Sequence, residues 1–322
     1  MRARWGALGV VVVAACEAQG GGTLDAAASA PSASASGPTA GAPVPASAPV
    51  SAAAPPPSLP WVHEDPASAT LCPPNMVLVD GDAIPSAGHR CIAWISEKRD
   101  RCARYAPPPL TAGKRRHERF CIDRYEYPNL AGVRPAVMPD WFDARDSCAR
   151  EGKRLCASSE WTLACEGRET LPYPYGYERD VEACNIDRPR PVPEPDFQAF
   201  SEPRKIADEV DRLDLRVASG ERARCVSPFG AHDMTGNVDE WVVNEHHFEP
   251  LPPDVEEKDR PYVSGLKGGY WGPIRSRCRP MTTAHNPWFR FYQVGFRCCQ
   301  DPLDGSFHGP RYEDRLPKSR GR

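Results

Sequence analysis

The sequence predicts an α/β domain in which regular secondary structure is sparse. Apolar and polar residues alternate over residues 75–80, a pattern that indicates a short strand. Trp141, Ala144 and Cys148 lie on one face of a predicted helix that begins after Asp140 and ends at Gly152. The remaining apolar segments are short and separated by turn residues. The 322 residues suffice for one sizeable domain.

The other elements follow in order along the chain. Residues 81–117 are expected to be irregular, because they contain Pro107-Pro108-Pro109 and a basic run at 114–116 that we interpret as a solvated loop. A second strand is predicted over residues 120–126. A second helix is predicted over residues 158–166, where Ser158 is the candidate N-cap. Later segments are predicted as a brief helix within 186–222, short strands and turns at 230–241, 265–270 and 294–299, and a loose charged tail at 301–322.

The N-terminus is typical of an export signal. Arg2 and Arg4 precede a short apolar segment, Leu8 to Ala15, which is too short to span a bilayer as a helix. The run from Val13 to Cys16 has the small-residue pattern of a bacterial lipobox, so residues 1–15 are expected to be removed and Cys16 to carry a diacylglycerol. Glu17 offers no inner-membrane retention signal, so we expect a lipid anchor at the outer membrane. A plain secretory signal with a chance cysteine is the alternative.

Composition separates a tether from the domain. Residues 16–70 comprise the lipidated cysteine and a segment rich in alanine, proline and serine, which is expected to be a disordered tether. The domain is expected over residues 71–300. The net charge of −3 gives no global field that would favour nucleic acid. Of the 13 cysteines, twelve remain after Cys16, and an exported protein is expected to pair them in disulfides.

Four sequence blocks carry a family resemblance. They are Cys121–Asn129; Trp141–Cys165 with its Gly152-Lys153-Arg154-Leu155 core; Tyr173–Ile186; and Phe229–Cys298 with Gly236-Asn237-Val238-Asp239-Glu240-Trp241 and Gly295-Phe296-Arg297-Cys298. Together they resemble the formylglycine-generating enzyme family, also called the sulfatase-modifying factor family. The resemblance implies the formylglycine-generating-enzyme fold, a sparse α/β domain related to C-type lectins.

The resemblance also implies disulfides and a metal site. By analogy with the family, Cys148 is expected to bond Cys298, and Cys165 to bond Cys278. The other eight cysteines allow 105 pairings, which stay open. Family members bind calcium at the positions of Asp233, Gly236, Val238 and Glu240. Two carboxylates and two backbone carbonyls are hard oxygen ligands that suit a structural Ca²⁺ ion. A glycine-asparagine hairpin turn with two surface acids is the alternative.

The chain departs from the family at its catalytic centre. The family enzymes hold Cu(I) between two thiolates, but no cysteine occurs between Cys225 and Cys278. We therefore assign no catalytic residues, and we do not expect the protein to bind copper. Adjacent Cys298 and Cys299 are expected to bond different partners rather than to act as a redox pair.

Two function classes remain open from the sequence. The first is a cell-envelope lipoprotein whose non-catalytic domain binds or scaffolds a peptide or small molecule. Its ligand groove is expected at Trp271, Arg275, Arg277 and His285, because arginine and aromatic residues are typical of recognition surfaces. The alternative assigns Trp271 to the core and the arginines to solvent. The second class is an extracytoplasmic metal-dependent oxidoreductase with non-thiolate chemistry.

The lipobox generates a direct prediction. Replacing Cys16 with serine should remove the acylation site, so that the protein moves from the membrane fraction to the soluble fraction after cell lysis. The matched control is Cys91→Ser, which leaves the lipobox intact. An intact mass that shows an unmodified Cys16 in the membrane-associated protein would contradict the prediction.

Overall fold

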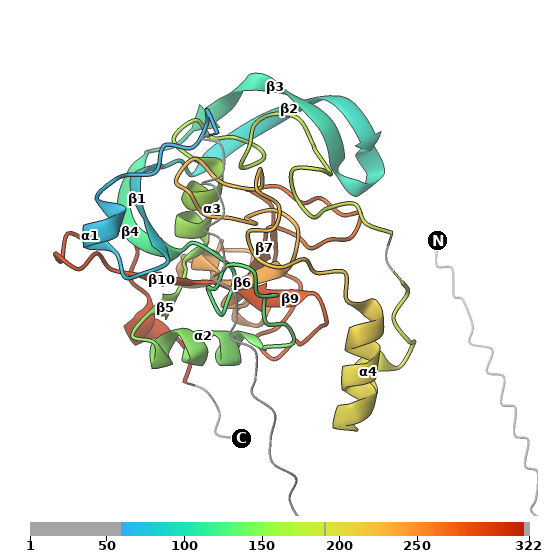
Figure 1. The fold of residues 1–322 in the computed structure, drawn as a ribbon. Helices are drawn as coiled ribbons and strands as arrows, with labels where there is room; N and C mark the ends of the chain where they lie inside the picture. Colours follow the sequence, from blue (N-terminus) through green and yellow to red (C-terminus); the bar gives the residue numbers. More distant parts are fainter. Residues whose placement is uncertain (1–58, 190, 319–322) are drawn as a thin grey trace, which may run out of the picture. The chain divides into compact units, whose positions relative to one another are not determined.

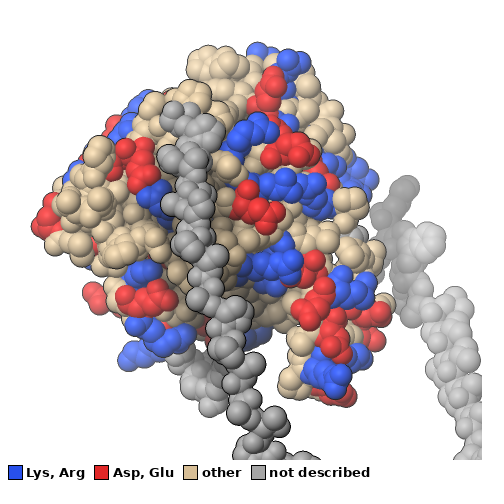
Figure 2. Space-filling view, viewed as in Figure 1, with Lys and Arg blue, Asp and Glu red and all other residues tan. Residues whose placement is uncertain are grey.

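The computed structural model describes residues 59–189 and 191–318. The predicted signal peptide, Cys16 and the tether as far as residue 58 lie outside the described residues. Within the described part, no helix is long and apolar enough to cross a membrane. Figure 2 shows acidic and basic side chains interspersed over the described residues of one face.

The first sheet contains the predicted first strand. Its strand order is β1-β4-β10-β5, and all its pairings are antiparallel (Figure 1). The bounds are Met76–Ala83 for β1, Arg116–Asp123 for β4, Cys298–Gln300 for β10 and Arg154–Leu155 for β5. In β1, the segment from Met76 to Val79 is buried, because one face packs on α3 and the other on α1 and Cys121.

A two-stranded ribbon replaces the irregular segment expected between residues 81 and 117. Strands β2 (Ser86–Ser96) and β3 (Arg101–Ala112) pair antiparallel, and the ribbon arches across the top of Figure 1. The expectation was wrong because the prolines at 107–109 were taken as strand breakers. The three prolines fall in a register shift of the ribbon, between the pairs Gly88–Leu110 and Arg90–Ala106, so they take no part in the ladder pairing.

The third sheet carries the segments that build the site described below. Its order is β8-β7-β6-β9. The bounds are Met281–Thr282 for β8, Ser264–Lys267 for β7, Asp239–Val243 for β6 and Val294–Phe296 for β9. Strand β6 pairs parallel to β9, and the other pairings are antiparallel. Every residue of β6 and β7 is buried, so this sheet forms an interior layer of the domain.

The two predicted helices form where the sequence places them. Helix α2 (Trp141–Arg150) begins with a capping box, in which the Asp140 carboxylate accepts from the Asp143 backbone N–H at 2.8 Å. Helix α3 spans Ser158–Glu166. Ser158 is its first helical residue rather than its cap. The distant Glu245 carboxylate instead accepts from the Ser158 hydroxyl and the Ser159 N–H, at 2.9 and 2.6 Å.

Two short α-helices and five 3₁₀ turns complete the described structure. Helix α4 (Pro203–Leu213) confirms the brief helix expected within 186–222, and Pro203 stands at its first turn. The remaining elements are α1 (Ser68–Leu71), η1 (Glu97–Arg99), η2 (Phe197–Ala199), η3 (Glu245–Phe248), η4 (Glu257–Asp259) and η5 (Glu313–Arg315).

Two boundary expectations differ from the structure. Residues 59–70, expected within the tether, pack on the domain: Trp61 donates its indole N–H to the Val226 carbonyl at 3.0 Å, and Glu64 pairs with Arg124. Residues 301–318, expected to be loose, also pack. Tyr312 stacks on Phe248 with ring centroids 4.6 Å apart, and Leu316 joins the apolar cluster around α2. Single aromatic anchors such as Trp61 and Tyr312 order these polar segments without any periodic pattern.

Six disulfides connect the described elements. The structure contains both bonds that the resemblance implies, Cys148–Cys298 and Cys165–Cys278. The other four pairs, which the sequence left open, are Cys72–Cys121, Cys91–Cys102, Cys156–Cys299 and Cys184–Cys225. The adjacent Cys298 and Cys299 bond different partners, as expected. Cys298 joins the first sheet to α2, and Cys299 joins it to the segment before α3.

Candidate functional site

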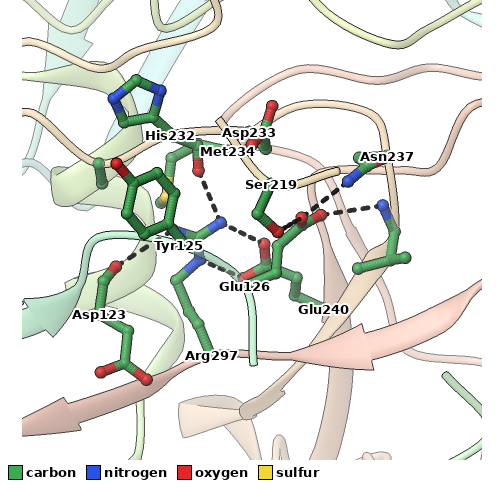
Figure 3. A network of polar contacts seen from close by, with 12 residues as sticks. Asp123, Tyr125, Glu126, Ser219, His232, Asp233, Met234, Asn237, Glu240 and Arg297 are labelled. Carbon is green, nitrogen blue, oxygen red and sulfur yellow. Dashed lines mark hydrogen bonds and ion pairs between the residues drawn. The ribbon is translucent and has the colours of Figure 1, made fainter. Parts of the chain in front are cut away.

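A buried ion pair joins β6 to the segment between β9 and β10 (Figure 3). Arg297, between β9 and β10, donates from Nε and Nη2 to the two carboxylate oxygens of Glu240 on β6, both at 2.7 Å. Both side chains are almost completely buried. The same arginine donates to the backbone carbonyls of Asp123 and His232, at 3.2 and 2.8 Å. One guanidinium thus joins β6, the end of β4 and the loop before β6.

A second carboxylate is buried close to this pair. Glu126 accepts from the Ser219 hydroxyl at 3.0 Å, the Asn237 side-chain amide at 2.7 Å and the Val238 N–H at 3.2 Å (Figure 3). Burial raises the pKa of Glu126 well above its usual range, and the nearby charges of Asp233 and Glu240 raise it further. Glu126 therefore orients the turn at residues 237–238 through neutral donors.

Asp233 is the third acid of the cluster. Its Oδ2 accepts from the Gly220 N–H at 2.8 Å, whereas its Oδ1 is buried and accepts no hydrogen bond from any described residue. Burial raises the pKa of the Asp233 carboxyl. Glu126, Asp233 and Glu240 thus place three acids around the single Arg297 guanidinium seen in Figure 3. Three carboxylates would carry more negative charge than one guanidinium can balance. The cluster therefore requires a further cation or one or more bound protons.

The turn that carries these groups depends on left-handed backbone geometry. Gly236 has φ +86°, and a Cβ there would collide with the carbonyl oxygen and carbon of Asn185. Asn237 has φ +54° and is held by its side chain, whose Oδ1 accepts from the Val217 N–H at 3.0 Å and the Asn185 amide at 3.1 Å. Glycine and asparagine are the residues that tolerate this conformation. The Gly-Asn motif is therefore a requirement of the backbone.

A family model matches this chain over residues 105–302, which include the whole cluster. Its description is sulfatase-modifying factor enzyme 1-like domain. The chain belongs to this family. Its fold is accordingly the formylglycine-generating-enzyme fold that the sequence predicts, a mixed α/β domain with few helices and sparse regular structure.

Two curated proteins are similar to this chain over about half of its length. The inactive Cα-formylglycine-generating enzyme 2 of Bos taurus is 26% identical over 171 residues, which are 51% of this chain and 49% of the relative. The serine/threonine-protein kinase pkn1 of Chlamydia caviae is 26% identical over 177 residues, 52% of this chain and 24% of the kinase. The chain thus matches about a quarter of the kinase's length and half of the bovine protein's.

Solved structures give remote matches. PvdO from Pseudomonas aeruginosa is 18% identical, with a TM-score of 0.39, and the match covers 70% of this chain and 94% of that one. CarF is 16% identical, with a TM-score of 0.38, over 71% of this chain and 98% of that one.

The four residues expected to bind calcium lie in one turn and the start of β6. The Oδ1 atom of Asp233 has no hydrogen-bond partner among the described residues. Both carboxylate oxygens of Glu240 accept from Arg297, and the Glu240 Oε2 also accepts from the Trp161 indole N–H at 2.7 Å. In the described part of the chain, no three His, Cys, Asp or Glu side chains are grouped so that they could hold a metal ion.

Of the four residues expected to line a ligand groove, the structure keeps Arg275 and Arg277 together and places Trp271 in the core. Trp271 is completely buried and packs between Tyr270 and Tyr292, so it belongs to the core and the groove assignment is corrected. Arg275 donates to the Met281 carbonyl at 3.2 Å, and Arg277 pairs with Asp100. His285 stacks on Phe289 with centroids 3.8 Å apart. The sequence could not separate a core tryptophan from an interface tryptophan, because both occur beside arginine.

A small cavity lies beside Arg275 and Arg277. It has a volume of about 20 Å³ and is lined by Asp239, Arg275 and Arg277 among others. This is room for about one water molecule. Burial raises the pKa of Asp239 to about 7, although its carboxylate accepts from the Gly269 N–H at 3.0 Å. Sequence reasoning missed the buried Glu126 and the role of Arg297, even though both residues stand in the family blocks.

The ion pair generates a stability prediction. Arg297→Met removes the only group that donates two hydrogen bonds to Glu240 and leaves a buried carboxylate unpaired. We expect unfolding in urea to show a loss of about 3–5 kcal/mol. The matched control is Arg311→Met, whose exposed pair with Asp301 should contribute less than about 1 kcal/mol. Equal losses for the two variants would contradict the central role of Arg297.

Proposed function

We propose that this chain is a lipid-anchored cell-envelope protein whose domain binds or scaffolds a ligand and does not generate formylglycine. One observation carries the proposal: all twelve cysteines in the described residues are bonded in the six disulfides. The thirteenth, Cys16, is the proposed lipid attachment site. A disulfide sulfur is neither a thiolate ligand nor a nucleophile.

The residues at the family's catalytic position support this proposal. The family enzymes place two thiolates between the Gly-Gly motif and the cysteine that matches Cys278, and here residues 270–277 contain none. Tyr270 and Trp271 instead fill the interior together with Tyr292. The inactive bovine relative is compatible with a domain that keeps the scaffold without the chemistry.

The proposed ligand is a peptide or small molecule outside the cytoplasm. Trp271 is excluded from direct contact by its burial, so the recognition surface would use Arg275, Arg277 and His285. Arg277 has a side-chain exposure of 18% and is held by Asp100 and by the Tyr105 hydroxyl, at 2.8 Å from the latter. Held arginines lose little conformational entropy when they bind, which favours recognition.

We also propose a structural Ca²⁺ ion at Asp233, Gly236, Val238 and Glu240. The unpaired Asp233 Oδ1 and the excess of buried acids over Arg297 support it, because a hard cation would relieve both. A carboxylate oxygen has two lone pairs, so Glu240 can accept from Arg297 and still offer an oxygen to the ion. The carbonyls of Gly236 and Val238 would complete the protein's share of the ligands.

The absence of thiolates predicts inactivity as a formylglycine-generating enzyme. We expect the full-length protein, supplied with Cu(I), oxygen and a sulfatase-type cysteine peptide, to leave the peptide mass unchanged. Loss of catalytic groups that act as a unit lowers a rate by many orders of magnitude. An active family enzyme, assayed in parallel, is the positive control. Turnover above the buffer blank would overturn the non-catalytic proposal.

The calcium proposal predicts a thermal response. Ca²⁺ in about hundredfold excess over its Kd should stabilise the folded protein by about 2.7 kcal/mol, and EDTA should lower Tm by about 5–10 °C. Asp233→Asn should reduce this response, whereas Asp304→Asn, at an exposed carboxylate, should keep it. A Tm that is indifferent to EDTA and to added Ca²⁺ would refute the site.

A further inference from the structure

A cavity of about 770 Å³ lies beside the capped N-terminus of α3. It is bordered by α3, by the segment that leads into β4, by η3 and by the β7–β8 region. Trp271, Arg275, Arg277 and His285 do not line it. Its volume falls within the range of about 300–1,000 Å³ that is usual for small-molecule sites.

The floor of this cavity carries a buried lysine. Lys267, on β7, is only 2% exposed. Its Nζ donates to the Thr162 hydroxyl at 2.7 Å and to the Arg279 carbonyl at 2.9 Å, which leaves one of its three N–H donors. The Trp161 ring centroid lies 5.3 Å from Nζ. Lys267 forms no ion pair with any carboxylate in the described residues.

The nearby carboxylate of the floor already has a partner. Glu166, at the end of α3, accepts from Nε and Nη2 of Arg279 at 2.7 and 2.6 Å. Two cations, Lys267 and Arg279, therefore face one anion on the floor. A buried ammonium without a paired carboxylate is costly, and burial lowers the pKa of Lys267 to about 7. An anion that reaches Nζ would favour the charged form of this side chain.

The rim of the cavity adds two more free cations. Lys114 and Arg115 are exposed, and their side chains have no hydrogen-bond or ion-pair partner among the described residues. The acids of the rim are Glu245, which pairs with Arg116 at 3.1 Å, and Glu249, whose carboxylate lies 3.1 Å from the His246 imidazole. The cavity lining therefore carries five lysine and arginine side chains against three carboxylates.

We propose that this cavity binds a small organic dianion, a dicarboxylate or a phosphate monoester. One negative charge meets the remaining N–H of Lys267 at the floor, and the second lies toward Lys114 and Arg115. Charge-assisted hydrogen bonds from ammonium and guanidinium groups suit carboxylate and phosphate oxygens alike. This site is independent of the proposed calcium ion and of the recognition surface at Arg275 and Arg277.

The test is isothermal titration of the full-length protein with two probes. Succinate represents the dicarboxylates and glycerol 3-phosphate the phosphate monoesters, and their neutral analogues are succinamide and glycerol. We expect at least one dianion to bind with a Kd of about 1 mM or tighter, and neither neutral analogue to bind comparably. Binding of one probe alone identifies the ligand class. Failure of both probes at about 10 mM would overturn the proposal.

Two variants locate the binding site. Lys267→Met keeps the length of the side chain but removes its charge, and Lys114→Ala with Arg115→Ala removes the rim cations. Each should weaken binding about tenfold or more, because hydrogen bonds to charged groups are lost. The matched control is Lys98→Ala with Arg99→Ala, an exposed basic pair in the β2–β3 ribbon, which should leave the Kd unchanged.

The rim variant keeps the test decisive if Lys267→Met does not fold. Near-ultraviolet circular dichroism establishes whether each variant keeps its tertiary packing. An unchanged Kd in folded Lys267→Met, or in the rim variant, would overturn the assignment. Equal weakening in the Lys98 and Arg99 control would also overturn it, because it would indicate non-specific attraction to positive charge.

Discussion

The Arg297–Glu240 ion pair is the interaction on which the rest of the domain depends. Removing two charges from water costs several kcal/mol per ion, and this cost is offset only when every donor and acceptor is used. Here Arg297 bonds both oxygens of Glu240 and also reaches the backbone of Asp123 and His232. Trp161 adds a further donor to Glu240 from α3. One buried pair thereby positions both large sheets and a helix.

Disulfides complete a scaffold that has little regular secondary structure. The bonds Cys148–Cys298, Cys156–Cys299 and Cys165–Cys278 each close a loop of more than 100 residues. In the chain-entropy model a single loop of this size contributes up to about 4–5 kcal/mol, which compensates for short strands and few helices. The six disulfides together use every cysteine thiol of the described residues, so cysteine serves stability here. This use of cysteine is the structural reason to propose a binding role.

Charge is distributed unevenly inside the domain. Glu126, Asp233 and Glu240 give the centre an excess of acid, whereas Lys267 and Arg279 give the neighbouring cavity an excess of base. The two regions adjoin, because Glu240 on β6 and Lys267 on β7 lie opposite each other in the strand register. Trp161 contacts both side chains: its indole N–H donates to Glu240, and its ring lies beside the Lys267 ammonium. A cation bound at the acid cluster would neutralise its excess of negative charge, and an anion bound in the cavity would neutralise the excess of positive charge there.

The sequence alone determined the elements whose signals are local. Helices α2 and α3 follow from apolar spacing and turn residues, β1 follows from alternation, and the family and two disulfides follow from motifs in order. Tertiary structure decided what depends on distant partners. The β2–β3 ribbon, the Glu245 cap, the packing of Trp61 and Tyr312, and the burial of Trp271 have no local signal. A side chain's environment is set by residues that only folding brings beside it, so the unpaired Lys267 became visible only in the folded chain.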